Sequence, residues 1–222
     1  MTTKHQYPSF LELTHIVPPV DELIAGYNKL KTREKSESDM RFSSIRPALS
    51  AAFPFASNGY DYVAVTDIRE DLKHTVVTAS PSAMYKLAMR GQAPAMDDRN
   101  YTQIKDDVPE SLVKFLSQFR GQVARCRFAT LKSLQTIYQH IDTALDHTVR
   151  VHVPLITDKF NLFGIVDATG NVTVRHLEVG KVYFVNTALQ HFVINSSRDT
   201  DRTHLVVNLN SMEDIKEAEL TN

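Results

Sequence analysis

The sequence predicts a mainly β fold with flanking helices. Short strand-like runs follow one another between residues 122 and 210, and turn-forming segments such as 167–171 and 179–180 separate several of them. No helical periodicity interrupts these runs, whereas the first half of the chain holds two segments with helical spacing. Many short strands at such spacing are typical of an all-β barrel or sandwich, and the preceding helices are expected to cover one outer face.

The first expected helix follows Pro19. Its apolar positions recur at helical spacing, at Leu23, Ile24, Tyr27 and Leu30. Acidic residues at its start suit the positive end of a helix dipole. A second helix is expected behind Pro109, since proline is compatible with a first helical position. Its apolar face is formed by Leu112, Val113, Leu116 and Phe119.

Between the two helices, the residue types favour strands at 60–66 and 74–78, which are rich in aromatic or β-branched side chains. The polar stretch 91–100, broken by Pro94, is expected to be a long loop and is a candidate lid. The strand-like runs that follow are VARCRFA, LQTIYQHI, VRVHVPL, NLFGIVD, VTVRHLEV, KVYFVNT, HFVIN and RTHLVVNL. We therefore expect one domain over residues 1–222, with a helical or mixed part at 1–121, a β core at 122–210 and a C-terminal tail at 211–222.

The bulk composition gives no support for a polyanionic partner. The 25 basic and 26 acidic side chains leave a net charge of -1, so no global field favours a nucleic acid or an anionic membrane. No apolar run reaches the roughly 20 residues that cross a bilayer. Cys126, the only cysteine, cannot form an internal disulfide, and the first residues lack the apolar core of a secretory signal. We expect a cytoplasmic protein that contacts neither nucleic acid nor membrane.

A possible metal site begins with His140 and Asp142. On an extended segment these two side chains share one face, because residue 141 points the other way. Taken alone, such a pair is more often a hydrogen-bonded surface pair. His191, which begins the run HFVIN, is the candidate third ligand. Two histidines and one carboxylate form a facial triad that leaves positions on a ferrous ion open for a bidentate cosubstrate and O2.

Arginine and histidine pairs on later strands add to this hypothesis. Arg202, a short strand and turn beyond His191, would offer a planar guanidinium to a dicarboxylate deep in the barrel. Arg150 and His152 share one strand face while valines take the other, so we expect them to line a polar interior rather than a wet outer edge. His204 is an alternative ligand, although a hydrogen-bonded interior histidine is the simpler interpretation.

No metal role is expected for the remaining histidines, which are His5, His15, His74, His147 and His176. Cys126 is expected to be a small buried hydrophobic residue, since no second cysteine or nucleophile motif accompanies it. Motifs of phosphate-binding loops, dinucleotide folds and serine hydrolases are absent from the sequence.

Five motifs in a fixed order carry a family resemblance. They are HID at 140–142, RVHVPL at 150–155, G-x-V-x-F-V-N at 180–186, HxxxN at 191–195 and RTHLVV at 202–207. This order resembles the aspartyl/asparaginyl β-hydroxylase family, whose smaller bacterial members include proline cis-4-hydroxylases. The resemblance spans about 123–209. Animal members of the endoplasmic reticulum are membrane anchored and lack the ligand carboxylate, so the chain is more similar to the small soluble members.

The resemblance implies a double-stranded β-helix, or jelly-roll, core that uses Fe(II), 2-oxoglutarate and O2 and releases succinate and CO2. Carried over by position, His140, Asp142 and His191 would bind iron, and Arg202 would bind the distal carboxylate of 2-oxoglutarate. Arg150 and His152 would face the other end of this cosubstrate or the substrate.

The expected substrate is a small molecule, best matched by a free amino acid, whose carboxylate would need a cation such as Arg150 or Arg127. Two alternatives stay open at this point. One is a hydroxylase of a peptide side chain or a nucleobase. The other is a cupin-like binding module that holds a small acid or a structural metal without turnover. The sequence does not predict the oligomeric state.

Overall fold

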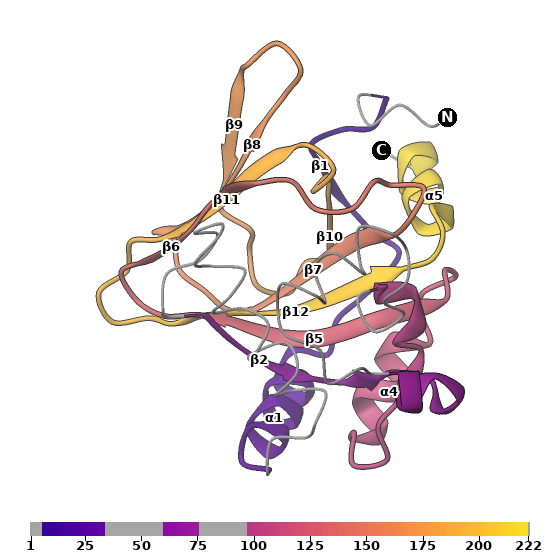
Figure 1. Cartoon of the computed structure of the whole chain (residues 1–222). Coiled ribbons are helices and arrows are strands. Elements are labelled where there is room, and N and C mark those ends of the chain that lie inside the picture. Colours follow the sequence, from indigo (N-terminus) through magenta and orange to yellow (C-terminus); the bar gives the residue numbers. More distant parts are fainter. Residues whose placement is uncertain (1–5, 34–59, 76–96, 222) are drawn as a thin grey trace.

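Two antiparallel sheets form the body of the protein in a computed structural model, which describes residues 6–33, 60–75 and 97–221 (Figure 1). The larger sheet has six strands in the order β1-β10-β7-β12-β5-β2. In this order they span Phe10–Glu12, Tyr183–Val185, Val149–Ile156, Arg202–Leu209, Val123–Leu131 and Tyr60–Ala64. Its central strands β7, β12 and β5 are the longest in the described part of the chain, so they form the rigid floor beneath the site.

The smaller sheet has four strands in the order β6-β11-β8-β9. They span Gln135–His140, Gln190–Asn195, Asn161–Val166 and Val172–Arg175. The β8–β9 hairpin projects away from the rest of the molecule (Figure 1). A two-stranded sheet pairs β3 (Thr66–Asp67) with β4 (Gln103–Ile104). The two larger sheets form a jelly-roll core, and the mainly β fold predicted from the sequence is confirmed.

Helices α1 (Val20–Lys31) and α4 (Glu110–Leu116) lie on the outer side of the large sheet (Figure 1). Their buried side chains belong to one apolar cluster with outward-facing residues of the sheet, among them Cys126, Phe128 and Val151. Burying such faces on one another removes apolar area from water and is the main stabilising contribution to the fold. The helices therefore cover the face of the sheet that is turned away from the other sheet.

Strand alternation divides the large sheet into an apolar and a polar face. On β7 the side chains of Val149, Val151 and Val153 are buried in the cluster under the helices. Arg150 and His152 point the other way, into the space between the sheets, where both line a cavity. The expectation that the valines pack beneath the helices while the arginine and histidine line a polar interior is confirmed.

Short 3-10 helices and a last α-helix complete the described structure: η1 (Glu70–Thr75), η3 (Asp98–Asn100) and α5 (Glu213–Thr221). The strand predicted at 74–78 is wrong at its start, because residues 74 and 75 end η1; its remainder lies outside the described residues. Only 97–100 of the loop predicted at 91–100 is described, and it contains η3.

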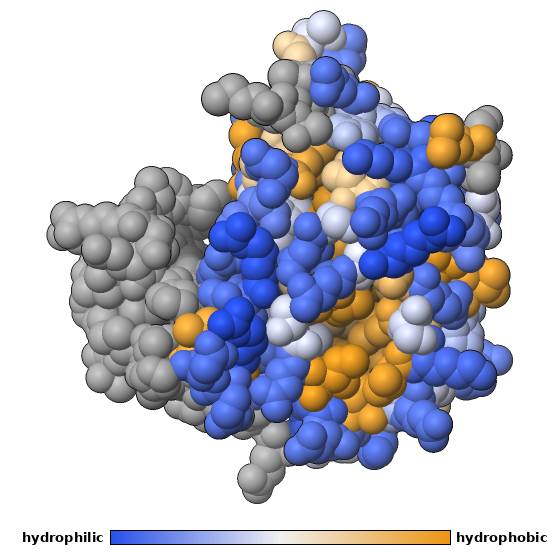
Figure 2. Space-filling view, turned by 90° about the vertical axis from the view of Figure 1, so that its right-hand side faces the viewer, coloured by the Kyte–Doolittle hydropathy of each residue, from blue (hydrophilic) through white to orange (hydrophobic). Residues whose placement is uncertain are grey.

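The predicted C-terminal tail is in fact helix α5. Asp214 in its first turn is buried and accepts hydrogen bonds from the backbone N–H groups of Arg120 and Gly121 at 3.1 and 3.0 Å. The helix is thereby attached to the start of β5. Within the described residues, every helix is too short or too polar to cross a bilayer. Hydrophilic residues cover much of the face on which α4 and α5 lie, with apolar groups in patches between them (Figure 2).

Candidate metal centre

Three side chains suited to metal binding meet at one edge of the smaller sheet. His140 ends β6 and His191 is the second residue of β11, and the two are direct partners in the antiparallel ladder. Asp142 lies just beyond β6. Its backbone N–H donates a hydrogen bond of 3.0 Å to the carbonyl of Thr187, in the connection that leads into β11. Strand pairing and this backbone hydrogen bond thus bring the three residues together.

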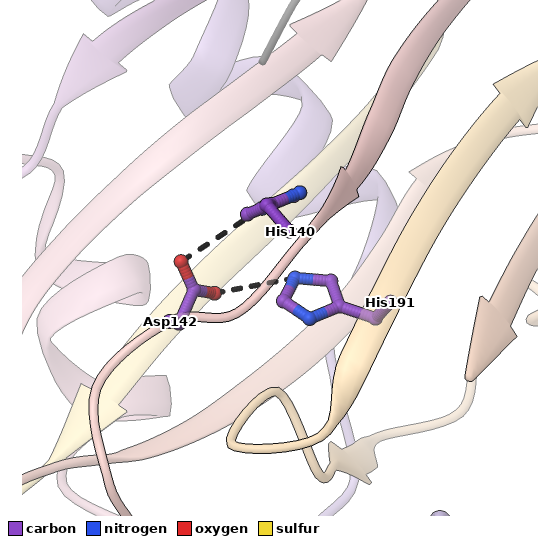
Figure 3. Close-up of side chains that lie close together, drawn as sticks. All are labelled: His140, Asp142 and His191. Carbon is purple, nitrogen blue, oxygen red and sulfur yellow. Dashed lines mark ion pairs between the residues drawn. The ribbon is translucent and has the colours of Figure 1, made fainter. Parts of the chain in front are cut away.

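The side chains of this triad point toward one common position (Figure 3). Nε2 of His140 lies 3.8 Å from one carboxylate oxygen of Asp142, and Nε2 of His191 lies 3.3 Å from the other. One ligand atom from each residue falls within 4.8 Å of those of the other two. Ligand atoms about 2.1 Å from one ion and at right angles to each other lie roughly 3 Å apart, so these residues fit a divalent ion after small adjustments.

The hydrogen bonds of both imidazoles also suit a metal. Nδ1 of His140 lies 2.7 Å from the carbonyl of Tyr138, and Nδ1 of His191 lies 3.0 Å from the carbonyl of Leu189. A carbonyl only accepts, so each Nδ1 must carry the proton and each Nε2 presents its lone pair. This outer hydrogen bond is typical of histidine ligands, because it fixes both the tautomer and the ring orientation.

The charge states match this assignment. Burial by itself raises the pKa of Asp142, but the Arg150 guanidinium, which is paired with this carboxylate, and the adjacent His191 outweigh burial and hold the pKa well below its usual range. Burial and the neighbouring His191 lower the pKa of His140. At neutral pH, Asp142 is therefore ionised and His140 is uncharged, which is the state that binds a metal ion.

The triad opens onto a cavity of about 200 Å³ between the two sheets. The cavity wall opposite the triad belongs to the large sheet and is cationic. It contains Arg125, Arg127, Arg150, His152 and Arg202. A cavity that joins a metal-binding triad to several guanidinium groups is suited to anionic ligands that also bind the metal.

Arg202 is a buried cation with only 3% of its surface exposed. Its Nη2 lies 3.0 Å from Nδ1 of His204, and its guanidinium stands 5.9 Å from the centre of the Phe163 ring. Burial lowers the pKa of Arg202 to about 10, so the group is still charged at neutral pH. In the described part of the chain no carboxylate forms an ion pair with it. Because an unpaired buried charge is costly, this arrangement favours an anionic ligand.

Arg150 and His152 lie on β7, where they pair in the ladder with Asn208 and Val206 of β12. Arg150 donates from Nε to the side-chain oxygen of Asn208 at 3.3 Å and is paired with Asp142. His152 is buried, and neither of its ring nitrogens has a hydrogen-bond partner within the described residues. Burial, with Arg202 and Arg150 nearby, lowers the pKa of His152 well below its usual value. His152 is thus a neutral ring free to bind a ligand.

The other described histidines lie outside the triad. His15 lies near Asp214, His147 lies 3.1 Å from Asp97, and His176 contacts the carbonyl of Asn161. His5 lies outside the described residues, as does the side chain of His74. His204 is not a ligand in this arrangement, since its Nδ1 faces Arg202. Among the described residues, the three-residue triad is the only cluster with metal-binding geometry.

Sequence reasoning missed two charged residues beside the cavity. Arg125 lies two positions before Arg127 on β5, so period-2 alternation was the signal that it shares the inner face. Asp98, in η3, contacts Arg125 and Arg150 of the cavity wall. Nothing in the local sequence predicts this contact, because η3 reaches the site through tertiary packing. Cys126 is buried as expected, and burial raises the pKa of its thiol.

A family model described as "Aspartyl/Asparaginyl beta-hydroxylase" matches residues 67–211. The matched range contains the triad and all the cavity arginines. The comparison with curated proteins gave no match.

Several solved structures also match, at low identity. An oxidoreductase of the 2OG-Fe(II) oxygenase family from Burkholderia pseudomallei is 17% identical, with 75% of this chain and 76% of that chain covered and a TM-score of 0.40. A prolyl-4-hydroxylase from Pseudomonas putida is 14% identical, with 85% and 99% covered and a TM-score of 0.36. The α-ketoglutarate-dependent epimerase SnoN from nogalamycin biosynthesis is 13% identical, with 92% and 78% covered and a TM-score of 0.41.

Proposed function

The chain belongs to the aspartyl/asparaginyl β-hydroxylase family of Fe(II)- and 2-oxoglutarate-dependent dioxygenases, and from this premise we propose that it hydroxylates a free amino acid or a close derivative. One observation carries the proposal. A triad of two histidines and a carboxylate shares one small cavity with Arg202, a buried cation that pairs with no carboxylate in the described residues. A dicarboxylate that chelates a metal needs both a metal site for its chelating end and a cation for its distal carboxylate.

His140, Asp142 and His191 are the proposed iron ligands. Bound iron, with O2 and 2-oxoglutarate, supplies the oxidising power to hydroxylate an unactivated C–H bond while succinate and CO2 are released. The protein contributes a preset geometry: both imidazoles are held by carbonyl acceptors, and the carboxylate is kept ionised by Arg150. With these three residues as ligands, the ion would keep coordination positions for the cosubstrates.

Arg202 is the proposed binding group for the distal carboxylate of 2-oxoglutarate. Its burial strengthens a charge-assisted hydrogen bond to that carboxylate, and Phe163 beneath the guanidinium limits its movement. His152 and Arg150 lie nearer the triad and are proposed to contact the opposite end of 2-oxoglutarate or the substrate. The cosubstrate would thus be fixed at both ends, which orients its reacting carbons.

Arg127 is the proposed partner of the substrate carboxylate. It lies on β5 opposite Val206 in the ladder, lines the cavity and is only 7% exposed. Its Nη1 is buried without a hydrogen-bond acceptor among the described residues. A substrate carboxylate would satisfy this donor and offset its charge. The cavity volume of about 200 Å³ supports a small substrate over a whole peptide chain.

The proposal is tested with anaerobically prepared protein supplied with Fe(II), 2-oxoglutarate and then O2. We expect succinate formation that requires both Fe(II) and 2-oxoglutarate, and one member of an amino-acid panel should gain the mass of a single oxygen atom. His191→Ala should abolish succinate formation, whereas His176→Ala, which alters a histidine outside the triad, should leave it intact.

Arg202 provides a second, independent measurement. Arg202→Met should raise the KM for 2-oxoglutarate by at least about tenfold, because it removes a charged hydrogen-bond donor. Succinate formation without any oxidised amino acid, together with turnover on peptides or nucleobases, would move the substrate assignment to those classes. No succinate under any of these conditions would refute the proposed activity.

A further inference from the structure

An acidic residue from outside the β core contacts the cationic wall of the cavity. Asp98 belongs to η3, between β3 and β4, and only 8% of its surface is exposed. We propose that Asp98 is a positioning residue that holds Arg150 and Arg125 in their working orientation, so that residues 97–100 complete the active site. The inference rests on the proposed function, because it assigns a role in binding 2-oxoglutarate.

The contacts of Asp98 form a closed ring with Arg150 and Asn208. One carboxylate oxygen of Asp98 accepts a hydrogen bond of 2.5 Å from the side-chain amide of Asn208 and lies 3.8 Å from Nη2 of Arg150. Asn208 in turn accepts from Nε of Arg150 at 3.3 Å. The third nitrogen of the guanidinium, Nη1, is directed at Asp142. Arg150 is therefore held on two sides so that its remaining side faces the proposed iron ligand.

The other carboxylate oxygen of Asp98 accepts from Nη1 of Arg125 at 3.2 Å. The Arg125 guanidinium also stands 5.7 Å from the ring centre of Tyr62 and 5.9 Å from that of Tyr101. Burial and the nearby charge of Arg127 lower the pKa of Arg125, and Asp98 opposes this effect. Asp98 thus stabilises the neighbouring guanidinium groups of Arg125 and Arg127, which would otherwise repel each other and turn toward water.

The segment that carries Asp98 is itself fixed at both ends. The side chain of Asp97 caps η3 by accepting from the backbone N–H of Arg99 at 3.0 Å, and it also lies 3.1 Å from Nε2 of His147. At the other end, Asn100 accepts from the backbone N–H of Arg69 at 2.9 Å, and Tyr101 is buried. Because the backbone around Asp98 is held in place, its carboxylate stays in position to bind Arg125 and Arg150.

Two roles for Asp98 predict opposite results. If it only offsets positive charge, its neutralisation leaves a more cationic cavity, and anions bind more tightly. If it positions Arg150, its neutralisation frees that side chain, and 2-oxoglutarate binds more weakly. Asp98→Asn separates the two roles, because it keeps the shape of the side chain and removes the charge.

The experiment is isothermal titration of 2-oxoglutarate into nickel-loaded protein without O2, so that binding is measured apart from turnover. We expect Asp98→Asn to raise the Kd for 2-oxoglutarate by about tenfold. Asp107→Asn is the matched control, since Asp107 also pairs with an arginine, Arg33, but lies away from the cavity. It should leave the Kd unchanged.

A double-mutant cycle tests whether Asp98 acts through Arg150. Asp98→Asn should have little further effect on the Kd in an Arg150→Gln background, whereas a merely structural role would give additive effects. If Asp98→Asn fails to fold, Asn208→Ser breaks the same ring and should raise the Kd in the same way. Unchanged or tighter binding by the folded variants would overturn the inference. Failure of the wild-type protein itself to bind 2-oxoglutarate would instead count against the proposed function.

Discussion

Arg202 and His204 are joined by a buried hydrogen bond in which Nη2 of the guanidinium donates to Nδ1 of the imidazole at 3.0 Å. Both residues lie on β12, two positions apart and on the same face of the strand. Burial, with Arg202 nearby, lowers the pKa of His204 well below its usual value, so the ring stays neutral and keeps a lone pair for its neighbour. The histidine thereby orients the guanidinium proposed to bind 2-oxoglutarate.

Replacing this acceptor should weaken cosubstrate binding. His204→Leu removes the hydrogen bond to Arg202 and leaves one guanidinium N–H without its acceptor, so we expect the KM for 2-oxoglutarate to rise by about tenfold. The kcat at saturating 2-oxoglutarate should change much less. His204→Asn, whose side-chain oxygen is able to accept, should recover part of the loss. A fall in kcat with an unchanged KM would contradict this role.

Metal affinity should depend on pH in a direction set by the ligands. The lowered pKa values of His140 and Asp142 mean that protons do not compete for these two groups at neutral pH. The Kd for nickel, measured by titration, should therefore be nearly constant between about pH 7 and 8 and should rise only when the pH falls below the ordinary histidine pKa of about 6.5. An affinity that weakens steadily from pH 8 downward would contradict the lowered pKa of His140.

Chelation should remove the metal without unfolding the chain. The apolar cluster under the helices lies on the opposite face of the large sheet from the triad, so its packing does not depend on an ion. Circular dichroism of chelated protein should keep its β signature, and Tm should rise when nickel is returned, because the ion binds only the folded state. Asp142→Ala should abolish that rise.

A second buried hydrogen-bond chain supports stability rather than chemistry. Tyr27 on α1 bonds through its hydroxyl to Thr130 on β5 at 3.0 Å, and Thr130 bonds to Thr203 on β12 at 3.0 Å. Tyr27→Phe leaves the threonine pair with one partner fewer, so the free energy of unfolding in urea should fall by about 1 kcal/mol. The KM for 2-oxoglutarate should not change. Tyr138→Phe, which alters an exposed tyrosine, is the stability control. Its free energy of unfolding should equal that of the wild-type protein within the error of the measurement.

Much of the site was predictable because it is built on strands. Period-2 spacing indicates that Arg150 and His152 share a face, and the valines that alternate with them indicate which face is apolar. The family resemblance implies His140, Asp142 and His191 as one ligand set, and the pairing of β6 with β11 makes the two histidines direct partners in the ladder. Local patterns are informative here because the strand period transfers directly to the geometry of the cavity.

The features that were missed depend on contacts between distant segments. Residues 74 and 75 have β-branched neighbours but end a 3-10 helix, since tertiary context overrides so short a run. Helix α5 was missed because its sequence is polar, and the buried Asp214 that attaches it to β5 lacks a local signature. Asp98 is likewise invisible to periodicity, because its partners lie on β5, β7 and β12.

Gly164 is the position on β8 where a side chain would disturb the strand that carries His191. In the ladder it lies opposite Phe192, and a Cβ built on it would come within 2.1 Å of that ring. Gly164→Ala therefore forces the ring off the sheet, and the partly exposed position of Phe192 lets it move at moderate cost. We expect the free energy of unfolding in urea to fall by about 1 to 2 kcal/mol. Because His191 adjoins Phe192, nickel affinity should also fall. Adding Phe192→Leu to Gly164→Ala should recover part of the lost stability and part of the lost nickel affinity, because a shorter side chain leaves room for the new methyl group. If both losses persist in the double variant, contact with the Phe192 ring is not their cause.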